Sequence, residues 1–415
     1  MRPKSGGGGF RGEQQKLGDA SRVALRLRIL FPRILFRSDP MRILHTIPGR
    51  NWGGMEHRTI EQVKWLVAHG HQVWLAAPED GEPFRRAKAL GLPVIPLCFD
   101  PPLRAVPALR RFIRENAIEV MDAHVTRDAK AGLFCLDLCA QVRSRHVNQY
   151  LKPSFMRRLQ WRLSDHVITV AECTRQDLVR DGIIDAARSC SVGGWADERF
   201  FDLADPVATR SRLRVEIGIA DGATAIVCVG MLRPDKGQNF LLQALALLKV
   251  RGLDLTLVLA GSATAESAEY EAGLKRQAEE QGLTVHFLGY REDVSELMQM
   301  ADLVVIPSLT EAQPRVAVQA FATGRPVVAS AVGGVPEIVR DGETGWLVPP
   351  ANPQVLADAV AQVLADPAAT ARVSQGARAL AETRMRFDHR MAETLAIYET
   401  AIHRAKTRPW VRVKG

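Results

Sequence analysis

The sequence predicts an α/β protein made of two doubly wound domains, each with a parallel sheet between layers of helices. Three observations support this class. Short apolar runs alternate with helical segments, the same alternation starts again in the second half, and the chain of 415 residues is too long for one ordinary core. We therefore expect one domain over residues 41–200 and a second domain over residues 206–385.

The first domain is expected to begin at Met41. A strand at 42–47 leads through a glycine-containing loop into a helix at 55–69, whose apolar residues fall on one face and which Gly70 ends. Residues 196–222 lose the regular apolar runs and carry charge, which is typical of a linker. Further apolar runs predict strands at 73–78, 92–97, 119–124 and 166–171.

The second domain contains the most informative stretch of the chain, Leu303–Arg340. An apolar strand is followed by a polar loop that opens at Ser308 and by a helix at about 314–323. Ligands of parallel sheets collect at the carboxyl ends of strands, and Glu311 stands at such an end with Gln319 eight residues later. Eight residues are just over two helical turns, so both side chains can reach the same ligand. The strands of this domain are expected at 224–231, 255–261, 284–289, 303–308, directly after Gly324, and 345–350.

The two ends of the chain differ from the domains. Residues 1–40 contain a run of four glycines and a segment in which arginine interrupts every apolar run, which a secretory signal does not tolerate. We interpret them as a disordered basic leader upstream of the true start at Met41, with a basic amphipathic membrane arm as the alternative. The last segment, 386–415, carries a long helical run that we expect to fold back onto the first domain.

The net charge of +9 is concentrated in the first half of the chain. Residues 1–40 hold nine basic and three acidic residues and residues 41–200 hold 23 and 18, whereas the remainder holds 23 and 25. This distribution favours an anionic membrane surface or an anionic acceptor as the partner. Nucleic acid is the runner-up and is not expected, because the sequence has no RNP, zinc-finger or helix-turn-helix motif.

The composition indicates a globular protein of the cytoplasm. Hydrophobic residues make up 47% of the chain and charged residues 24%, and no apolar run reaches the length that a transmembrane helix needs. The cysteines show neither metal-ligand nor disulfide spacing, so we expect reduced thiols. The six are Cys98, Cys135, Cys139, Cys173, Cys190 and Cys228.

Two glycine-containing loops are candidates for binding a phosphate group. Gly53 and Gly54 come directly before a helix, where small residues let backbone N–H groups approach an anion; an ordinary turn is the alternative. The segment GMLRPDKG, 230–237, places Arg233 and Lys236 at the end of the second domain's first strand. Two cations there suit a diphosphate, because arginine offers a bidentate fork and lysine a point charge. A solvated turn is the alternative.

One histidine of the first domain is a candidate for the active site. His124 ends the strand expected at 119–124, where a side chain enters the ligand-binding edge of the sheet. The alternative is a structural histidine whose hydrogen bonds are satisfied within the fold. Asp128, four residues later, either orients His124 or caps the following helix.

The segment 152–165 combines basic residues with large apolar ones. It either lies against lipid headgroups or forms a solvated helix face with a few core anchors. The residues concerned are Phe155, Arg157, Arg158, Leu159, Trp161 and Arg162.

These motifs together resemble a known family. The segment 230–237 and the stretch 307–350, preceded by the Gly53–Gly54 loop, resemble the GT-B glycosyltransferases of family 4, which carry a Glu-x7-Glu signature. The resemblance covers about residues 41–400. It implies two Rossmann-like domains facing each other across a cleft, and a retaining, metal-independent hexosyltransferase that needs no cofactor and uses a nucleotide-diphospho-sugar as its donor.

The family resemblance also implies an acceptor and a location. Many members build lipopolysaccharide, capsule or other surface glycans at the cytoplasmic membrane. We therefore expect a glycan or lipid-linked acceptor, and a peripheral position on the cytoplasmic face of the inner membrane.

The resemblance implies roles for individual residues. Gly53 and Gly54 match the loop over the donor phosphates, and His124 matches an active-site histidine close to the transferred sugar. Lys236 matches the lysine of the diphosphate site, and Glu311 the first signature acid, which hydrogen-bonds donor-sugar hydroxyls.

The rest of the donor motif follows Glu311. The backbone of Gln313, Pro314, Arg315 and Val316 matches the loop that meets the sugar and the phosphates. Gln319 matches the second signature acid, which holds the ribose.

Two positions depart from the family pattern. Arginine usually follows the glycine of the diphosphate motif, where this chain has Met231; we expect Arg233 to substitute, because alternate residues of an ending strand point the same way. Gln319 lacks the charge of the second acid, which is expected to cost ~1–2 kcal/mol of donor binding.

The expected mechanism needs no metal ion. The sequence has no Asp-x-Asp triplet to hold one, so Arg233, Lys236 and helix-end amides are expected to stabilise the leaving diphosphate. The family view implies front-face attack assisted by the leaving phosphate. Two alternatives remain. One is a nucleotide-sugar epimerase, which needs carboxylates besides Glu311; the other is a non-catalytic nucleotide-sugar or lipid-binding module, suggested by Met231 and Gln319.

Overall fold

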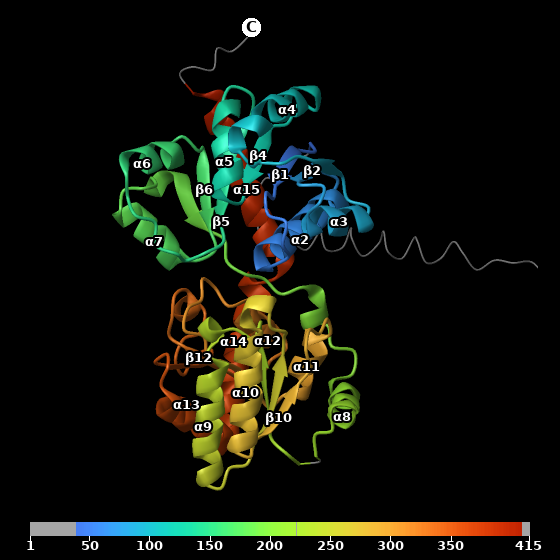
Figure 1. Ribbon diagram of the computed structural model, residues 1–415, viewed down its shortest axis with the longest axis vertical. Helices are drawn as coiled ribbons and strands as arrows, with labels where there is room; N and C mark the ends of the chain where they lie inside the picture. Colours follow the sequence, from blue (N-terminus) through green and yellow to red (C-terminus); the bar gives the residue numbers. More distant parts are fainter. Residues whose placement is uncertain (1–38, 221, 409–415) are drawn as a thin grey trace, which may run out of the picture. The chain divides into compact units, whose positions relative to one another are not determined.

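The structure is a computed structural model that describes residues 39–220 and 222–408. Between Arg42 and Val348 the described residues form two parallel sheets, one of seven strands in the order β3-β2-β1-β4-β5-β6-β7 and one of six in the order β10-β9-β8-β11-β12-β13. Both sheets change direction of winding at a central strand, β1 in the first and β8 in the second. The predicted class of two doubly wound α/β domains is therefore confirmed (Figure 1). The interpretation of residues 1–40 as a leader falls almost wholly outside the described residues.

The first sheet contains two strands that the apolar pattern did not predict. These are β5 and β7, whose sequences AQVRSR and SCS read as polar loops although β5 is buried. The strands of this sheet are β1 (Arg42–Thr46), β2 (Gln72–Ala77), β3 (Val94–Pro96), β4 (Val120–Ala123), β5 (Ala140–Arg145), β6 (His166–Thr169) and β7 (Ser189–Ser191). Its helices are α2 (Gly54–Ala68), α3 (Glu82–Ala89), α4 (Pro102–Glu115), α5 (Thr126–Gly132), α6 (Phe155–Arg162) and α7 (Glu172–Arg180).

The second sheet is apolar on both faces, as a sheet covered by helices requires. Along β11, Leu303 and Val305 join one core cluster and Val304 and Ile306 join another, because successive side chains of a strand point to opposite faces. The strands are β8 (Ala225–Val229), β9 (Thr256–Ala260), β10 (Thr284–Phe287), β11 (Leu303–Ile306), β12 (Val327–Ser330) and β13 (Trp346–Val348). The helices are α9 (Gln238–Val250), α10 (Ala268–Glu280), α11 (Val294–Met300), α12 (Arg315–Ala322), α13 (Pro353–Ala365) and α14 (Pro367–Arg384).

The segment expected to be a linker is a packed part of the fold. Residues 196–222 contain helix α8 (Pro206–Ile217), which Asp205 caps and Gly218 ends. Phe200 and Leu213 of this segment are fully buried. The segment does connect the two sheets, between β7 and β8, but it contains regular structure. Its apolar anchors are few and widely spaced, so the local pattern resembles a charged loop. In the second domain, Gly334 is followed by a short 3-10 turn, Val335–Glu337.

The last helix, α15 (Phe387–Lys406), packs on the first sheet. The Tyr398 hydroxyl donates a hydrogen bond to Asp122 of β4 at 2.7 Å, and Arg404 donates to the carbonyl of Asp165 before β6 at 3.1 Å. Helix α15 therefore contributes buried side chains to the first domain, although it lies at the other end of the described chain. No helix within the described residues is long and apolar enough to cross a membrane.

Candidate functional site

The charged residues predicted for the donor site meet at one edge of the second sheet. Strands β8 and β11 are neighbours, and the loops that follow them carry Lys236 and Glu311. The Lys236 Nζ lies 2.6 Å from Glu311 Oε2, and the side chains are 24% and 16% exposed. The structure thus brings together two residues from separate motifs, in an ion pair that stays accessible to a ligand.

Glycines allow these loops to approach each other closely. Gly237, directly after Lys236, has a φ of +68°, and a Cβ there would lie 2.1 Å from the carbonyl oxygen of Pro307. Gly333 has a φ of +51°, and a Cβ there would lie 1.7 Å from the carbonyl oxygen of Glu311. Side chains at either position would collide with backbone, so both loops depend on glycine for their shape.

Arg233 is placed differently from the expectation. Strand β8 ends at Val229, so Met231 and Arg233 do not lie on a strand and the argument from alternating side chains does not apply. The Arg233 side chain is 42% exposed, and its Nε donates to Asp235 at 2.9 Å. Arg233 therefore lies in the loop of Lys236 but is paired with a local acid.

The loop after Glu311 makes contacts with the first half of the chain through two side chains. The Gln313 side-chain oxygen accepts a hydrogen bond from the backbone N–H of Gly194. The Arg315 guanidinium donates to His57 Nδ1 at 3.1 Å. Burial, and then the charge of Arg315, lower the pKa of His57 to about 4.

The remaining donor-motif residues lie at the start of α12 and along it. Pro314 is its N-cap residue, and Val316 and Gln319 are half-buried on the helix. The Gln319 carbonyl accepts a backbone hydrogen bond from Thr323, so Gln319 lies in regular helix, whereas Glu311 lies in the loop four residues before α12, and the expected spacing of two helical turns does not apply.

The carboxylate of Glu56 lies beside the Gly53–Gly54 loop. Gly53 is the N-cap of α2 and Gly54 its first residue, as the motif requires. A Cβ at Gly53 would lie 3.1 Å from a carboxylate oxygen of Glu56, and burial raises the pKa of that carboxyl. The helix start that was predicted to receive a phosphate is therefore next to a carboxylate in the first turn.

His124 is deeply buried and uses both ring nitrogens within the fold. The side chain is 3% exposed; its Nε2 lies 3.0 Å from His45 Nδ1, and its Nδ1 lies 2.8 Å from His146 Nε2. Asp128 accepts from the backbone N–H groups of His124 and Val125 at 2.8 and 3.0 Å. Asp128 thus caps α5 and holds the backbone of His124, and it does not contact the ring.

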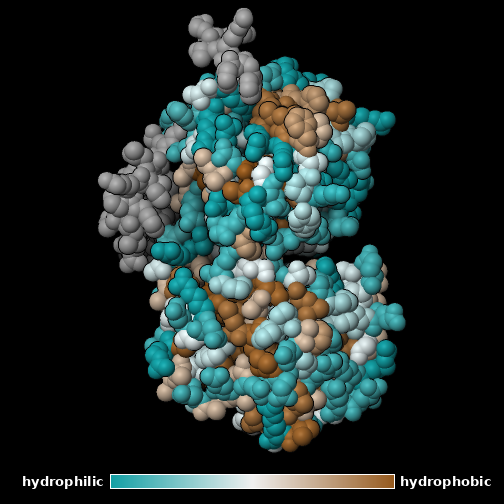
Figure 2. All heavy atoms as spheres, turned by 90° about the vertical axis from the view of Figure 1, so that its left-hand side faces the viewer, coloured by the Kyte–Doolittle hydropathy of each residue, from teal (hydrophilic) through white to brown (hydrophobic). Residues whose placement is uncertain are grey.

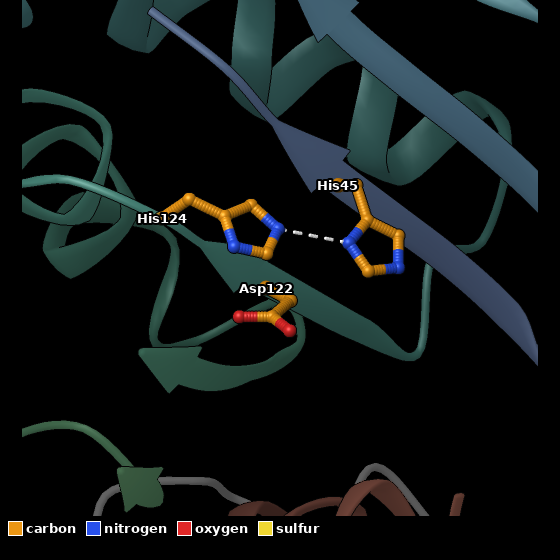
Figure 3. A group of neighbouring side chains, drawn as sticks. All are labelled: His45, Asp122 and His124. Carbon is orange, nitrogen blue, oxygen red and sulfur yellow. Dashed lines mark hydrogen bonds between the residues drawn. The ribbon is translucent and has the colours of Figure 1, made fainter. Parts of the chain in front are cut away.

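Sequence reasoning missed the side chains that surround His124. Figure 3 shows the rings of His45 and His124 with nitrogens facing each other and the carboxylate of Asp122 beside them. Asp122 Oδ2 accepts from Tyr398 at 2.7 Å and from Ser144 at 3.0 Å. No local motif could have identified this group, because its members come from β1, β4, β5 and α15.

The ligand atoms of His45, Asp122 and His124 lie within 4.8 Å of one another, and these residue types also occur at metal sites. The two imidazole nitrogens that face each other are already in a hydrogen bond. The facing ring nitrogens and Asp122 Oδ2 are therefore engaged within the fold, whereas Asp122 Oδ1 is buried with no hydrogen-bond partner among the described residues.

The chain matches two family models. Residues 52–191 match "Glycosyltransferase Family 4" and residues 209–380 match "Glycosyl transferases group 1", so the first model spans β2 to β7 of the first sheet and the second model spans all strands of the second sheet. The chain belongs to the GT-B glycosyltransferases of the group 1 type.

The curated relatives of this chain include transferases with different names. The chain is 35% identical over 249 residues to the D-inositol 3-phosphate glycosyltransferase of Mycolicibacterium paratuberculosis, which covers 59% of this chain and 54% of the relative. It is 31% identical over 218 residues to the alpha-D-kanosaminyltransferase of Streptomyces kanamyceticus, covering 52% of this chain and 55% of the relative. The chain spans about half the length of the curated relatives it matches.

Solved structures agree with the fold. The Anabaena protein HepE in complex with UDP is 26% identical, with a TM-score of 0.73 over 86% of this chain and all of HepE. A glycosyltransferase from Rickettsia africae has a TM-score of 0.80 at 17% identity, over 88% of this chain and 99% of its own, which bears on the fold alone. The predicted GT-B class is confirmed.

Proposed function

We propose that this protein is a retaining glycosyltransferase that moves a hexose from a nucleotide-diphospho-sugar to a glycan or lipid-linked acceptor in the synthesis of cell-surface polysaccharide or lipopolysaccharide. The observation that carries the proposal is the ion pair between Lys236 and Glu311 at the carboxyl edge of the second sheet. A structure of HepE with UDP-glucose, 25% identical to this chain, supports a nucleotide-sugar as the donor.

The proposed chemistry uses this pair and the loops around it. The leaving nucleotide diphosphate gains negative charge in the transition state, and the sugar becomes cationic. Lys236 meets the growing charge on the phosphates, Arg233 adds a second cation once it leaves Asp235, and Glu311 accepts hydrogen bonds from sugar hydroxyls. Charge stabilisation of this kind proceeds without a metal ion, and the front-face attack implied by the family retains configuration.

We place the acceptor side of the enzyme on an anionic membrane surface, at the cytoplasmic face of the inner membrane. Helix α6 supports this placement because Trp161 is its only buried residue, whereas Phe155 is 79% and Met156 57% exposed. Lys152 and Arg162 are exposed beside them, so apolar side chains and positive charge occur together. Figure 2 views the side on which α6 lies and shows apolar patches among hydrophilic residues.

Binding to vesicles tests the membrane surface. Replacing both Phe155 and Met156 with Ser is expected to weaken binding to vesicles of anionic phospholipid by roughly tenfold or more, since each side chain buries apolar area in the interface. Val250→Ser is the matched control, because Val250 is 89% exposed at the end of α9 in the other domain. Equal binding by the double variant and the control would contradict the placement on α6.

Activity is tested by mixing the purified protein with a panel of radiolabelled nucleotide-sugars and a membrane lipid extract. Label transferred to lipid or glycan supports the proposed transferase. Interconversion of the sugar without acceptor would instead indicate an epimerase, and donor that binds unchanged would indicate a binding module.

A further inference from the structure

A tyrosine hydroxyl on α10 supports the loop that carries Lys236. The Tyr270 hydroxyl accepts a hydrogen bond from the backbone N–H of Asn239 at 3.2 Å, and it lies 3.2 Å from Gln238 Oε1 and 3.0 Å from Asn239 Oδ1. Gln238 and Asn239 begin α9, two residues after Lys236, where backbone N–H groups have no partner within the helix. Tyr270 therefore holds the point at which the Lys236 loop becomes helix.

The same hydroxyl also reaches the start of the loop, through the side chain of Gln238. This side chain is 1% exposed, and its Nε2 donates to the carbonyl of Met231 at 3.0 Å. Because only the NH₂ group of the amide can donate to a carbonyl, the amide oxygen must face Tyr270, whose hydroxyl is then the donor. Burial raises the pKa of Tyr270, so the hydroxyl keeps its proton at neutral pH. One hydroxyl thus connects both ends of the segment 231–239.

The middle of the segment 231–239 is bonded to the loop that carries Glu311. The backbone N–H of Leu309 donates to the carbonyl of Asp235 at 2.8 Å. Asp235 directly precedes Lys236, and Leu309 lies two residues before Glu311. A shift of the segment would therefore move the backbone of Lys236 against the loop of its ion-pair partner, across the 2.6 Å contact between Lys236 Nζ and Glu311 Oε2.

The two cations of this segment differ in how firmly they are held. Arg233 is 42% exposed and pairs only with Asp235 of the same loop, whereas Lys236 is 24% exposed and lies between the Tyr270 contacts and Glu311. A cation stabilises a transition state most when it is already in place, and a misplacement of about 1 Å can cost up to about 100-fold in rate. The contacts of Tyr270 therefore act on the cation whose position matters most.

We propose that Tyr270 is a positioning residue of the donor site, whose hydroxyl fixes the segment 231–239 so that Lys236 Nζ meets the leaving diphosphate. The inference rests on the proposed sugar transfer. Tyr270 acts through the backbone of this segment and makes no contact with the reacting atoms. Its ring packs against the apolar core of the second domain, so the ring supplies the anchor and the hydroxyl supplies the direction.

The first variant is Tyr270→Phe, which keeps the packed ring and removes the hydroxyl alone. We expect kcat/KM for the nucleotide-sugar to fall by about 10-fold, because Lys236 is no longer held in place. Thr370→Val is the matched control. The Thr370 hydroxyl donates to the carbonyl of Val363 at 2.7 Å, between α14 and α13 of the same domain, so the control also loses one tertiary hydrogen bond and should stay within about twofold. Full activity of Tyr270→Phe would overturn the proposal.

A double-mutant cycle separates positioning of Lys236 from general support of the fold. If the hydroxyl acts through Lys236, Tyr270→Phe should cost about 10-fold in the unaltered protein and less than about twofold in the Lys236→Ala background, because the group that it positions is then absent. The same 10-fold loss of kcat/KM in both backgrounds would show that Tyr270 supports the domain in some other way, and would overturn the proposal.

The structural part of the proposal can be measured without any sugar transfer. Amide hydrogen exchange of the full chain, followed by NMR, should show the N–H groups of Asn239 and Leu309 exchanging at least about 10-fold faster in Tyr270→Phe, and unchanged in Thr370→Val. Asn239 loses its own acceptor, whereas Leu309 responds only if the whole segment 231–239 shifts. Unchanged exchange at Leu309 would overturn the proposal. If the unaltered protein transfers no sugar, the proposed function fails, while exchange at Leu309 still shows whether Tyr270 holds the segment.

Discussion

The carboxyl edges of the two sheets hold ionisable residues in opposite ways. At the second sheet, Lys236 and Glu311 are charged, paired and partly exposed. At the first sheet, His45 and His124 are buried and held neutral by lowered pKa values. A charged edge can exchange its internal ion pair for contacts with an anionic ligand, whereas a neutral buried edge can only pass hydrogen bonds along. The comparison teaches that similar positions in two similar folds can differ in charge and exposure, and that only the charged edge offers groups suited to an anionic ligand.

The strongest test of the charged edge removes either member of its ion pair. Lys236→Ala and Glu311→Ala are each expected to lower sugar-transfer turnover by at least ~100-fold, because each removes a preorganised contact to the transition state. Steady-state kinetics with the donor found in the nucleotide-sugar screen measures the effect.

A matched ion pair elsewhere in the domain serves as the control. Lys275 and Glu271 on α10 are 2.7 Å apart and have no place in the site, so Lys275→Ala should leave turnover within about twofold of the unaltered protein, as expected for an exposed pair. If Lys236→Ala and Glu311→Ala behaved like this control, the charged edge would not be the donor site.

The neutral edge should make the first domain sensitive to acid. A histidine whose pKa is lowered on folding stabilises the fold fully above its ordinary pKa of 6.5, and this stability is lost as pH falls toward the folded value of about 3. At pH 5 each of His45 and His124 is expected to cost about 2 kcal/mol relative to pH 7. Amide hydrogen exchange, corrected for intrinsic rates, should show β1 and β4 losing protection at pH 5 while β8 and β11 keep theirs. Equal losses of amide protection in both sheets at pH 5 would contradict the proposed difference between the two edges.

The apolar pattern and two motifs were enough to predict much of the second domain. Four of its strands, β8, β9, β11 and β12, are buried along almost their whole length and read as continuous apolar runs. All six strands, including the partly exposed edge strand β10, were expected near their observed positions. Lys236 and Glu311 could be placed at one edge because each follows a strand of the same parallel sheet. The exact direction of Arg233 could not be predicted, because it depends on where β8 ends and on the local acid Asp235.

The first domain was harder to predict because its central strands carry buried polar residues. Gln141, Arg143 and Ser144 of β5 are each less than 10% exposed, yet such residues read as loop in a single sequence. Missing β5 also hid His146, which follows it. The side chains around His124 come from positions up to 353 residues apart, as between His45 and Tyr398, and no spacing rule connects them. Only tertiary packing of α15 on the sheet creates that group.

The smallest expected effect concerns Gln319, where the charged edge lacks the second acid of the family signature. Gln319 is half-buried on α12, eight residues after Glu311 of the preceding loop, so a change of its head group should alter little else. Gln319→Glu restores a carboxylate that can accept charge-assisted hydrogen bonds from ribose hydroxyls, which is expected to tighten donor binding by ~1–2 kcal/mol, or roughly tenfold. Calorimetric titration with the nucleotide-sugar and with the free nucleotide measures the gain, which should be equal for both because each contains the ribose. A gain confined to the nucleotide-sugar would indicate that residue 319 contacts the sugar instead of the ribose. No gain at all would show that this position does not contact the donor, so that Lys236 and Glu311 alone define the charged edge.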